Sequence, residues 1–122
     1  MKELVIKKCP KCGAMVEVLR EYGCDVVCCG GKMETLIPNS FEASAEKHMP
    51  TYERVEDEIF VKVNHVMEKE HYIEWIAMVT DNRVCRAILF PEQNAECRFK
   101  YIQGSKIYAY CNKHGLWCAE VK

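Results

Sequence analysis

A cysteine and a histidine lie three residues apart near the end of the chain, in the segment CNKHG from Cys111 to Gly115. A thiolate and an imidazole are both good ligands for transition metals. A zinc finger would need a second cysteine close by, and a blue-copper site would need a methionine just downstream. Neither follows here, so any metal at this segment must take its other ligands from elsewhere in the chain.

Five of the nine cysteines fall in the first thirty residues, and four of these form two close pairs, C-x-x-C at Cys9 and Cys12 and the adjacent Cys28 and Cys29. In a reducing cytosol this density favours metal ligation over a disulfide framework. Four thiolates can surround one ion tetrahedrally, and the glycines that follow each pair let the backbone turn closely around it. A segment of under about 40 residues seldom folds without such help. We therefore predict a structural metal, for which zinc and a single iron fit equally well.

The chain has only four histidines, all at predicted strand ends or in predicted loops: His48, His65, His71 and His114. A lone histidine is more often a hydrogen-bonded or solvated residue than a ligand. In an antiparallel sandwich, however, loops from distant parts of the sequence gather at one end, where imidazoles and the Cys111 thiolate can converge. Four imidazoles and one thiolate would leave a sixth position open. This set suits iron(II) that binds a small oxygen species better than it suits tetrahedral zinc.

The elements that must position these residues are short strands. Alternating apolar residues at 14–19 and 32–37 predict small strands around the cysteines, and 38–45 predicts a linker. Beyond the linker, segments separated by turn signals predict the seven strands of a β-sandwich, at 52–55, 59–63, 72–79, 83–90, 95–101, 106–111 and 116–121. The segment 71–79 also fits a helix face, but its β-branched and aromatic residues favour a strand. We expect an all-β chain with domains at 1–37 and 38–122.

Length and charge narrow the classes of function. The formal net charge of -1, with scattered lysines and arginines, argues against a nucleic-acid partner. The charged N-terminus lacks the apolar core of a signal peptide, and no apolar run approaches transmembrane length. We therefore expect a cytoplasmic protein that has no membrane partner.

Together, the motifs resemble those of the desulfoferrodoxins, the two-iron type of superoxide reductase. The resemblance covers nearly the whole chain, through CPKCG, VCCGG, EKHMP, HYIEWI with the His65 and His71 pair, and CNKHG. It implies a desulforedoxin-like N-terminal domain followed by a neelaredoxin-like catalytic domain with an immunoglobulin-like sandwich. It also implies two mononuclear irons in each chain. The ligands would be Cys9, Cys12, Cys28 and Cys29 for the first iron, and His48, His65, His71, His114 and axial Cys111 for the second.

The resemblance further implies an activity, the one-electron reduction of superoxide to hydrogen peroxide as a means of detoxification. Lys47 would attract the anionic substrate to the site, and Glu46 would occupy the sixth position of the oxidised iron. Judged without the resemblance, such a Glu-Lys pair is more often a solvated surface pair. Rubredoxin or a similar protein would donate electrons, and the chain would form a homodimer.

Two other functions remain open on the sequence. One is an electron-transfer metalloprotein of the cupredoxin or rubredoxin kind, and the other is a non-catalytic zinc-binding module. Trp75 is expected in the core rather than over the iron site, and Asn112 and Lys113 are expected only to shape a turn whose backbone amides can donate to the Cys111 sulfur. The remaining cysteines are expected to be buried or half-buried small apolar residues: Cys24, Cys85, Cys97 and Cys118.

Overall fold

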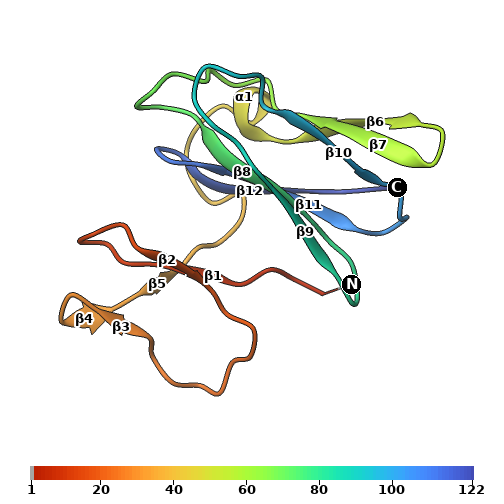
Figure 1. Cartoon of the computed structure of the whole chain (residues 1–122). Coiled ribbons are helices and arrows are strands. Elements are labelled where there is room, and N and C mark those ends of the chain that lie inside the picture. The colour runs from red at the N-terminus through yellow and green to blue at the C-terminus, as the bar shows by residue number, and fades with distance from the viewer. Residues whose placement is uncertain (1) are drawn as a thin grey trace. The chain divides into compact units, whose positions relative to one another are not determined.

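A computed structural model describes residues 2–122 of the chain (Figure 1). The described residues form two compact units, one from Glu3 to Ile37 and the other from Pro38 to Lys122 together with Lys2. Nearly all regular structure in both units is β-strand, which confirms the predicted all-β class. Within the described residues, no helix has the length and apolar character needed to span a membrane.

The first unit contains a three-stranded antiparallel sheet and a separate hairpin. The sheet has the order β2-β1-β5, and its strands are β1 (Ile6–Lys8), β2 (Met15–Glu17) and β5 (Glu34–Thr35). The hairpin pairs β3 (Val27–Cys28) with β4 (Gly31–Lys32). Strands β1 and β3 were not predicted, because two or three residues are too few to show alternation. The unit buries few apolar side chains, among them Leu4, Ile6 and Met33, so its hydrophobic core is small.

The second unit is a sandwich of two antiparallel sheets, drawn one above the other in Figure 1. The three-stranded sheet, in the order β10-β7-β6, contains β6 (Thr51–Val55), β7 (Glu58–Lys62) and β10 (Glu96–Lys100). The four-stranded sheet, in the order β12-β11-β8-β9, contains β8 (Ile73–Val79), β9 (Val84–Ile88), β11 (Lys106–Cys111) and β12 (Gly115–Glu120). All seven predicted sandwich strands are present. The strand prediction for 71–79 is confirmed for residues 73–79, since β8 pairs with both β9 and β11.

The core of the sandwich is formed by every second side chain of two central strands, β7 and β11. Ile59 and Val61 of β7, and Ile107 and Ala109 of β11, are each two residues apart and fully buried. Because side chains two residues apart share one face of a strand, these pairs all enter the space between the sheets. Cys111 continues the inward series of β11, so the last residue of that strand carries its thiol into the sandwich interior.

A one-residue irregularity interrupts the pairing of β8 with β11. Tyr110 lies opposite Trp75, but Cys111 lies opposite Ile73, so Glu74 is an extra residue on β8. This is a β-bulge, which shifts the alternation of the bulged strand by one residue. As a result, both Ile76 and Ile73 face the core, although uninterrupted alternation would have placed Glu74 there.

Residues Ala45–His48 form a single helical turn, α1, which corrects the expectation for His48. The predicted linker 38–45 has no helix or strand except at its last residue, Ala45, whereas His48, predicted in a loop or at a strand end, lies in the turn. The backbone N–H of Met49 donates to the Ala45 carbonyl at 2.7 Å and closes the turn. Four residues cannot show helical periodicity, so the sequence carries no signal for this turn.

Candidate metal centres

One tight cluster contains four cysteines of the first unit: Cys9, Cys12, Cys28 and Cys29. Their sulfur atoms all lie within 4.8 Å of one another. The sulfur of Cys28 lies 3.6 Å from that of Cys12 and 3.9 Å from that of Cys29. Two thiolates on a tetrahedral ion with metal–sulfur bonds of about 2.3 Å are roughly 3.8 Å apart. The cluster therefore fits a four-sulfur metal ion.

Two tight turns present these sulfurs. After Cys9, the backbone N–H of Cys12 points at the Cys9 sulfur at 3.5 Å, and Gly13, with φ of +81°, donates to the Cys9 carbonyl at 3.0 Å. In the hairpin of β3 and β4, the two turn residues Cys29 and Gly30 have φ of 54° and 75°. Two positive φ values in a two-residue hairpin turn are the signature of a type I′ turn. This turn allows adjacent cysteines to face the same ion.

Electrostatics within the cluster favour a bound cation. Backbone N–H groups of Cys12 and Lys11 lower the pKa of the Cys9 thiol to about 6. Hydrogen bonds with the sulfurs of Cys12, Cys9 and Cys29 raise the pKa of the Cys28 thiol to about 12. Four thiolates packed this closely repel one another, so they cannot all be deprotonated near neutral pH without a positive ion among them.

The second candidate centre brings together the four histidines and Cys111, whose donor atoms all lie within 4.8 Å of one another. The Nδ1 atom of His114 lies 2.9 Å from Nε2 of His48 and 3.3 Å from Nε2 of His71. Nitrogens at a right angle on an ion, with bonds of about 2.1 Å, are roughly 3.0 Å apart. The Cys111 sulfur lies 3.4 Å from Nε2 of His65 and 3.8 Å from Nδ1 of His114.

Backbone carbonyls orient two of the imidazoles. Nδ1 of His48 lies 2.7 Å from the Ser44 carbonyl, which the α1 turn brings beneath it, and Nδ1 of His65 lies 2.5 Å from the Val66 carbonyl. A carbonyl oxygen only accepts, so in each ring Nδ1–H is the donor and the lone pair of Nε2 faces the centre. Converging lone pairs with no proton between them are what a metal ion requires, and the donor set therefore fits a metal.

The pKa values of the site agree with neutral imidazoles. Burial lowers the pKa of His65 and of His114, and the neighbouring histidines lower both further. At Cys111, burial raises the pKa of the thiol, while hydrogen bonds from the backbone N–H groups of Lys113 and His114 act in the opposite direction. The expected donation from this turn to the sulfur is thus present. A metal ion would supply the positive charge that a buried Cys111 thiolate needs.

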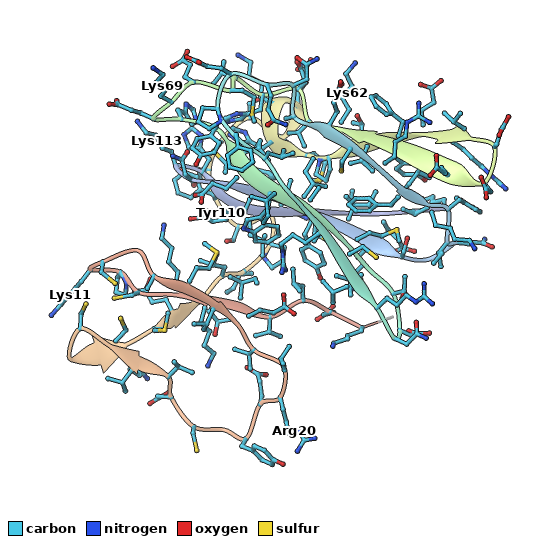
Figure 2. The ribbon with its side chains drawn as sticks, in the orientation of Figure 1. Lys11, Arg20, Lys62, Lys69, Tyr110 and Lys113 are labelled. Carbon is cyan, nitrogen blue, oxygen red and sulfur yellow. The ribbon has the colours of Figure 1, made fainter. Side chains whose placement is uncertain are left out.

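A hollow of about 520 Å³ opens onto the second centre and is called the mouth below. Its lining includes His48, His65, His71 and His114 together with Lys47, Glu42 and Glu68. Glu46 is exposed on α1 and is not among the lining residues. Lys69 and Lys113, which Figure 2 shows at one end of the sandwich, are not among the lining residues. The mouth is therefore lined by both acidic and basic side chains, and Lys47 is the lysine among them.

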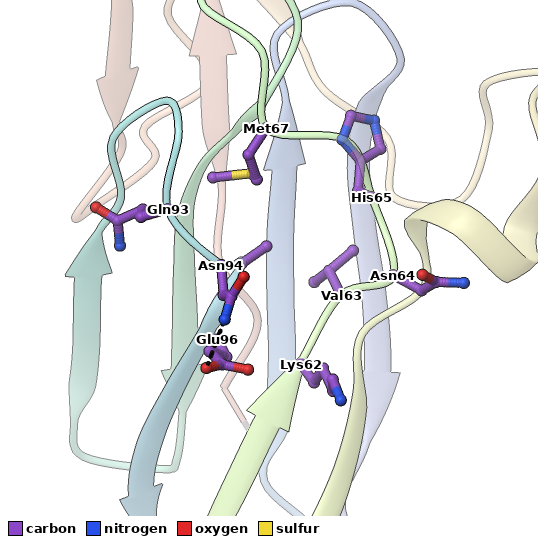
Figure 3. Close-up of a pocket in the computed structure, with 9 residues that line it drawn as sticks. Lys62, Val63, Asn64, His65, Met67, Gln93, Asn94 and Glu96 are labelled. Atoms are coloured by element: carbon purple, nitrogen blue, oxygen red, sulfur yellow. Dashed lines mark hydrogen bonds between the residues drawn. The ribbon is translucent and has the colours of Figure 1, made fainter.

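His65 also borders a second hollow of about 370 Å³ (Figure 3). Figure 3 shows His65 and Met67 at one end of this hollow and Lys62 and Glu96 at the other. The Met67 sulfur accepts the backbone N–H of Ile73 at 3.4 Å, so it ties this loop to the start of β8. His65 thus lines both hollows.

Aromatic contacts at the second centre were missed by sequence reasoning. Trp117, which is buried, stacks on the His48 ring and donates its indole N–H to the His114 carbonyl at 3.0 Å. Phe41 packs edge-on against the His114 ring at a centroid distance of 5.4 Å. Trp75, the tryptophan considered from the sequence, instead stacks on Tyr110. The only sequence signal for Trp117 was its position three residues after His114.

The four further cysteines lie outside both clusters. Cys85, Cys97 and Cys118 are half-buried, as expected, and Cys85 and Cys97 pack against the sandwich core. Cys24 is exposed, which contradicts the expectation that it would be at least half-buried. It lies in the irregular segment before β3, where few apolar side chains are available to cover it.

Comparison with known proteins gives one consistent result. Residues 40–120 match the family model described as Desulfoferrodoxin. The chain is 41% identical over 123 residues to a desulfoferrodoxin of Syntrophotalea carbinolica, covering 98% of each chain, and 40% identical over 120 residues to one of Nitratidesulfovibrio vulgaris, covering 94% of each. The crystal structure of a superoxide reductase from Treponema pallidum aligns with a TM-score of 0.76 and 26% identity, over 98% of this chain and 100% of that one.

The sequence similarity extends over both units, and each unit holds one of the two ligand clusters described above. A family model that matches most of the chain, together with relatives near 40% identity along nearly its full length, leads to one conclusion: the chain belongs to the desulfoferrodoxin family.

Proposed function

We propose that this chain is a superoxide reductase, which combines superoxide, one electron and two protons into hydrogen peroxide. The observation that carries the proposal is the convergence of four imidazole nitrogens and the Cys111 sulfur beneath an open mouth that contains Lys47. Family membership and the Treponema pallidum superoxide reductase fold support the same activity. Bound at this centre, iron(II) would supply the electron and an open position for the small anion.

The donor set favours iron over the metals of the two alternative functions. Structural zinc is bound by four ligands in a closed tetrahedron, whereas five donors converge here. Blue copper uses two histidines, one cysteine and a weak axial methionine. In the described structure all four histidines join Cys111, so a copper centre would leave two imidazoles without a role. Neither an electron-transfer copper protein nor a zinc module explains the complete set.

Some residues around the centre would attract the anionic substrate, and others orient the imidazole ligands. The Lys47 ammonium group at the mouth attracts an anion and lowers the cost of negative charge that develops on it. The carbonyls of Ser44 and Val66 keep the Nδ1 protons of His48 and His65 directed away from the centre. Solvent reaches the mouth and is the source of the two protons. Glu46, which precedes Lys47 on the exposed turn α1, is proposed as the carboxylate that occupies the sixth position after oxidation.

The peroxide yield of the reduced, iron-loaded protein with a known amount of superoxide tests this function. Oxygen evolution is followed in the same experiment. One peroxide per superoxide without oxygen establishes reduction. One peroxide per two superoxides with oxygen released would mean dismutation. No reaction at all would indicate that the site serves electron transfer or structural metal binding instead.

For the first centre we propose a four-cysteine iron that relays electrons from rubredoxin or a similar donor. The exposed sulfurs of Cys12 and Cys29 support this role, since a donor can approach them closely. Substitution of Cys12 by serine distinguishes an electron-relay role of the first centre from a purely structural role. A folded variant with a normal direct reaction with superoxide but lost turnover with the donor would support relay. Loss of folding in the first unit would instead indicate a structural role.

We also propose that the chain is a homodimer in the cytoplasm. The first unit exposes large apolar side chains, with Leu19 79% and Tyr22 77% accessible, and a second copy would cover such a surface. Nine free cysteines are compatible with a reducing compartment. Light scattering of the purified, iron-loaded chain should give twice the 14.2 kDa mass of one chain. A monomer at micromolar concentration would contradict the dimer.

A further inference from the structure

Asn112 makes more contacts than a turn residue requires. Its Oδ1 atom accepts the backbone N–H of Tyr72 at 3.1 Å, and its Nδ2 donates to the Glu70 carbonyl at 3.0 Å. Its own backbone N–H donates to the Tyr72 carbonyl at 3.3 Å. Asn112 therefore satisfies both backbone groups of Tyr72, and it holds the segment that leads into β8 at three points.

These contacts lie at the shifted end of the ladder between β8 and β11. Beyond the bulge at Glu74, the only regular pair is Cys111 opposite Ile73. A single pair specifies register weakly, and a slip by one residue would move the side chains of the segment to the other face. Just past this pair, the Asn112 side chain adds two bonds beside the single main-chain bond from the Asn112 N–H to the Tyr72 carbonyl. It thereby fixes the register that the bulge creates.

The residues on either side of these bonds belong to the second metal centre. His71 directly precedes Tyr72, and Cys111 directly precedes Asn112. His71 also forms an isolated bridge with Glu68, in which each backbone N–H donates to the other residue's carbonyl, at 3.0 Å and 3.2 Å. The Asn112 bonds connect this bridge to the turn that carries Cys111 and His114, the donors that His71 must meet.

We infer that Asn112 is a positioning residue for the metal centre: it locks the register beyond the β8 bulge and so fixes the His71 imidazole relative to Cys111 and His114. The inference rests on the proposed function, because it assumes that these residues hold iron. Asn112 touches neither substrate nor the donor atoms in this role. It acts through the backbone of Glu70 and Tyr72.

The test compares the rate of iron loss from the two centres of one chain, with a chelator in excess and Mössbauer spectra to distinguish the sites. Asn112→Ala removes both side-chain bonds and should accelerate iron loss from the histidine and cysteine centre by about 10- to 100-fold. Loss from the four-cysteine centre should be unchanged. The visible charge-transfer band of the oxidised Cys111 centre should shift as well, because the thiolate and His71 relax relative to each other.

Two further variants keep the inference falsifiable. Asn112→Asp retains the acceptor for the Tyr72 N–H but places a carboxylate oxygen, which cannot donate, against the Glu70 carbonyl, so its iron loss should also exceed that of wild type; it carries the test if the alanine variant does not fold. Ser105→Ala is the matched control, since it removes one buried hydrogen bond, from Ser105 Oγ to the Ile102 carbonyl at 2.7 Å, at the opposite end of β11. Its iron loss should equal that of wild type.

The outcomes separate this inference from the function on which it rests. A wild-type chain that reduces superoxide, with Asn112 variants whose iron loss and spectra match wild type, would overturn the positioning role alone. A Ser105→Ala variant that loses iron as fast as Asn112→Ala would also overturn it, because general destabilisation would then explain the effect. A wild-type chain that holds no iron among the four histidines and Cys111 would overturn the proposed function itself.

Discussion

The indole ring of Trp117 lies almost parallel to the imidazole of His48, with ring centroids 5.1 Å apart and planes 21° apart. The same indole donates its N–H to the His114 carbonyl at 3.0 Å. One buried side chain thus contacts a histidine from α1 and the turn between β11 and β12. It links two ligand segments that are 66 residues apart in the sequence.

This linkage makes Trp117 a direct target for substitution. Trp117→Phe keeps an aromatic surface for His48 but removes the bond to His114, and should cost about 1 kcal/mol of unfolding free energy with a small effect on iron retention. Trp117→Leu also removes the stacking, and should release iron from the histidine centre about 10-fold faster. Chelator competition measures both rates. Trp75→Leu is the control, because Trp75 stacks on Tyr110. This substitution should lower the stability of the fold without changing the rate of iron loss.

Lys47 should govern how fast superoxide reaches the centre. It is the lysine that lines the mouth, and a cation at that position raises the local concentration of an anion. Lys47→Ala should slow the second-order reaction with superoxide by about 10-fold or more and flatten its dependence on ionic strength, because screened attraction is the part that salt weakens. Pulse radiolysis at several salt concentrations gives both values.

Lys100 provides the comparison for Lys47. Lys100 lies at one end of β10, opposite Glu58 of β7. The hollow beside His65 lies at the other end of β10, where Glu96 borders it. Lys100→Ala removes the same charge from the chain but not from the mouth. If both variants slow the reaction equally, net charge and not the position of Lys47 sets the rate.

The sandwich could be predicted from the sequence more completely than its site. The strand at 59–63 alternates, with Ile59, Val61 and Val63 buried, so it reveals its buried face locally. The apolar run 107–111 fits a strand that is buried on both faces. The turn α1 and strands β1 and β3 are too short to carry such a signal. The contacts of Trp117 with His48, and of Asn112 with Tyr72, join residues at least 40 apart in the sequence, and a single sequence has no local pattern that reports them.

The hairpin turn at Cys29 and Gly30 should be sensitive to a side chain at the glycine position. Gly30 has φ of +75°, a conformation that costs an L-residue roughly 1–2 kcal/mol. Gly30→Ala should therefore destabilise the four-cysteine centre and lower its iron content. Gly31→Ala is a matched control, because Gly31 has no positive φ and a Cβ there meets nothing within 4 Å. Iron analysis and thermal unfolding of both variants test this, and equal losses would show that the turn is not under conformational constraint.

Cys97 should make the second unit less stable at alkaline pH. Burial raises the pKa of its thiol to about 12 from the ordinary value of 9.0. Between these values the unfolded chain loses the Cys97 proton while the native protein keeps it, so the native state binds more protons and stability falls as pH rises. The limiting slope is about 1.4 kcal/mol per pH unit, and the observed slope should be smaller because the half-buried side chain is partly solvated.

A comparison of wild type with Cys97→Ala isolates this contribution. The free energy of unfolding, measured by denaturant titration from pH 8 to pH 10.5, should decline more steeply in wild type than in the variant, since other groups titrate equally in both. Below pH 8 the difference between the two proteins should be constant, and it should reflect only the smaller side chain packed against the core. Parallel curves across the whole range would mean that the Cys97 thiol titrates in the native sandwich as it does in the unfolded chain.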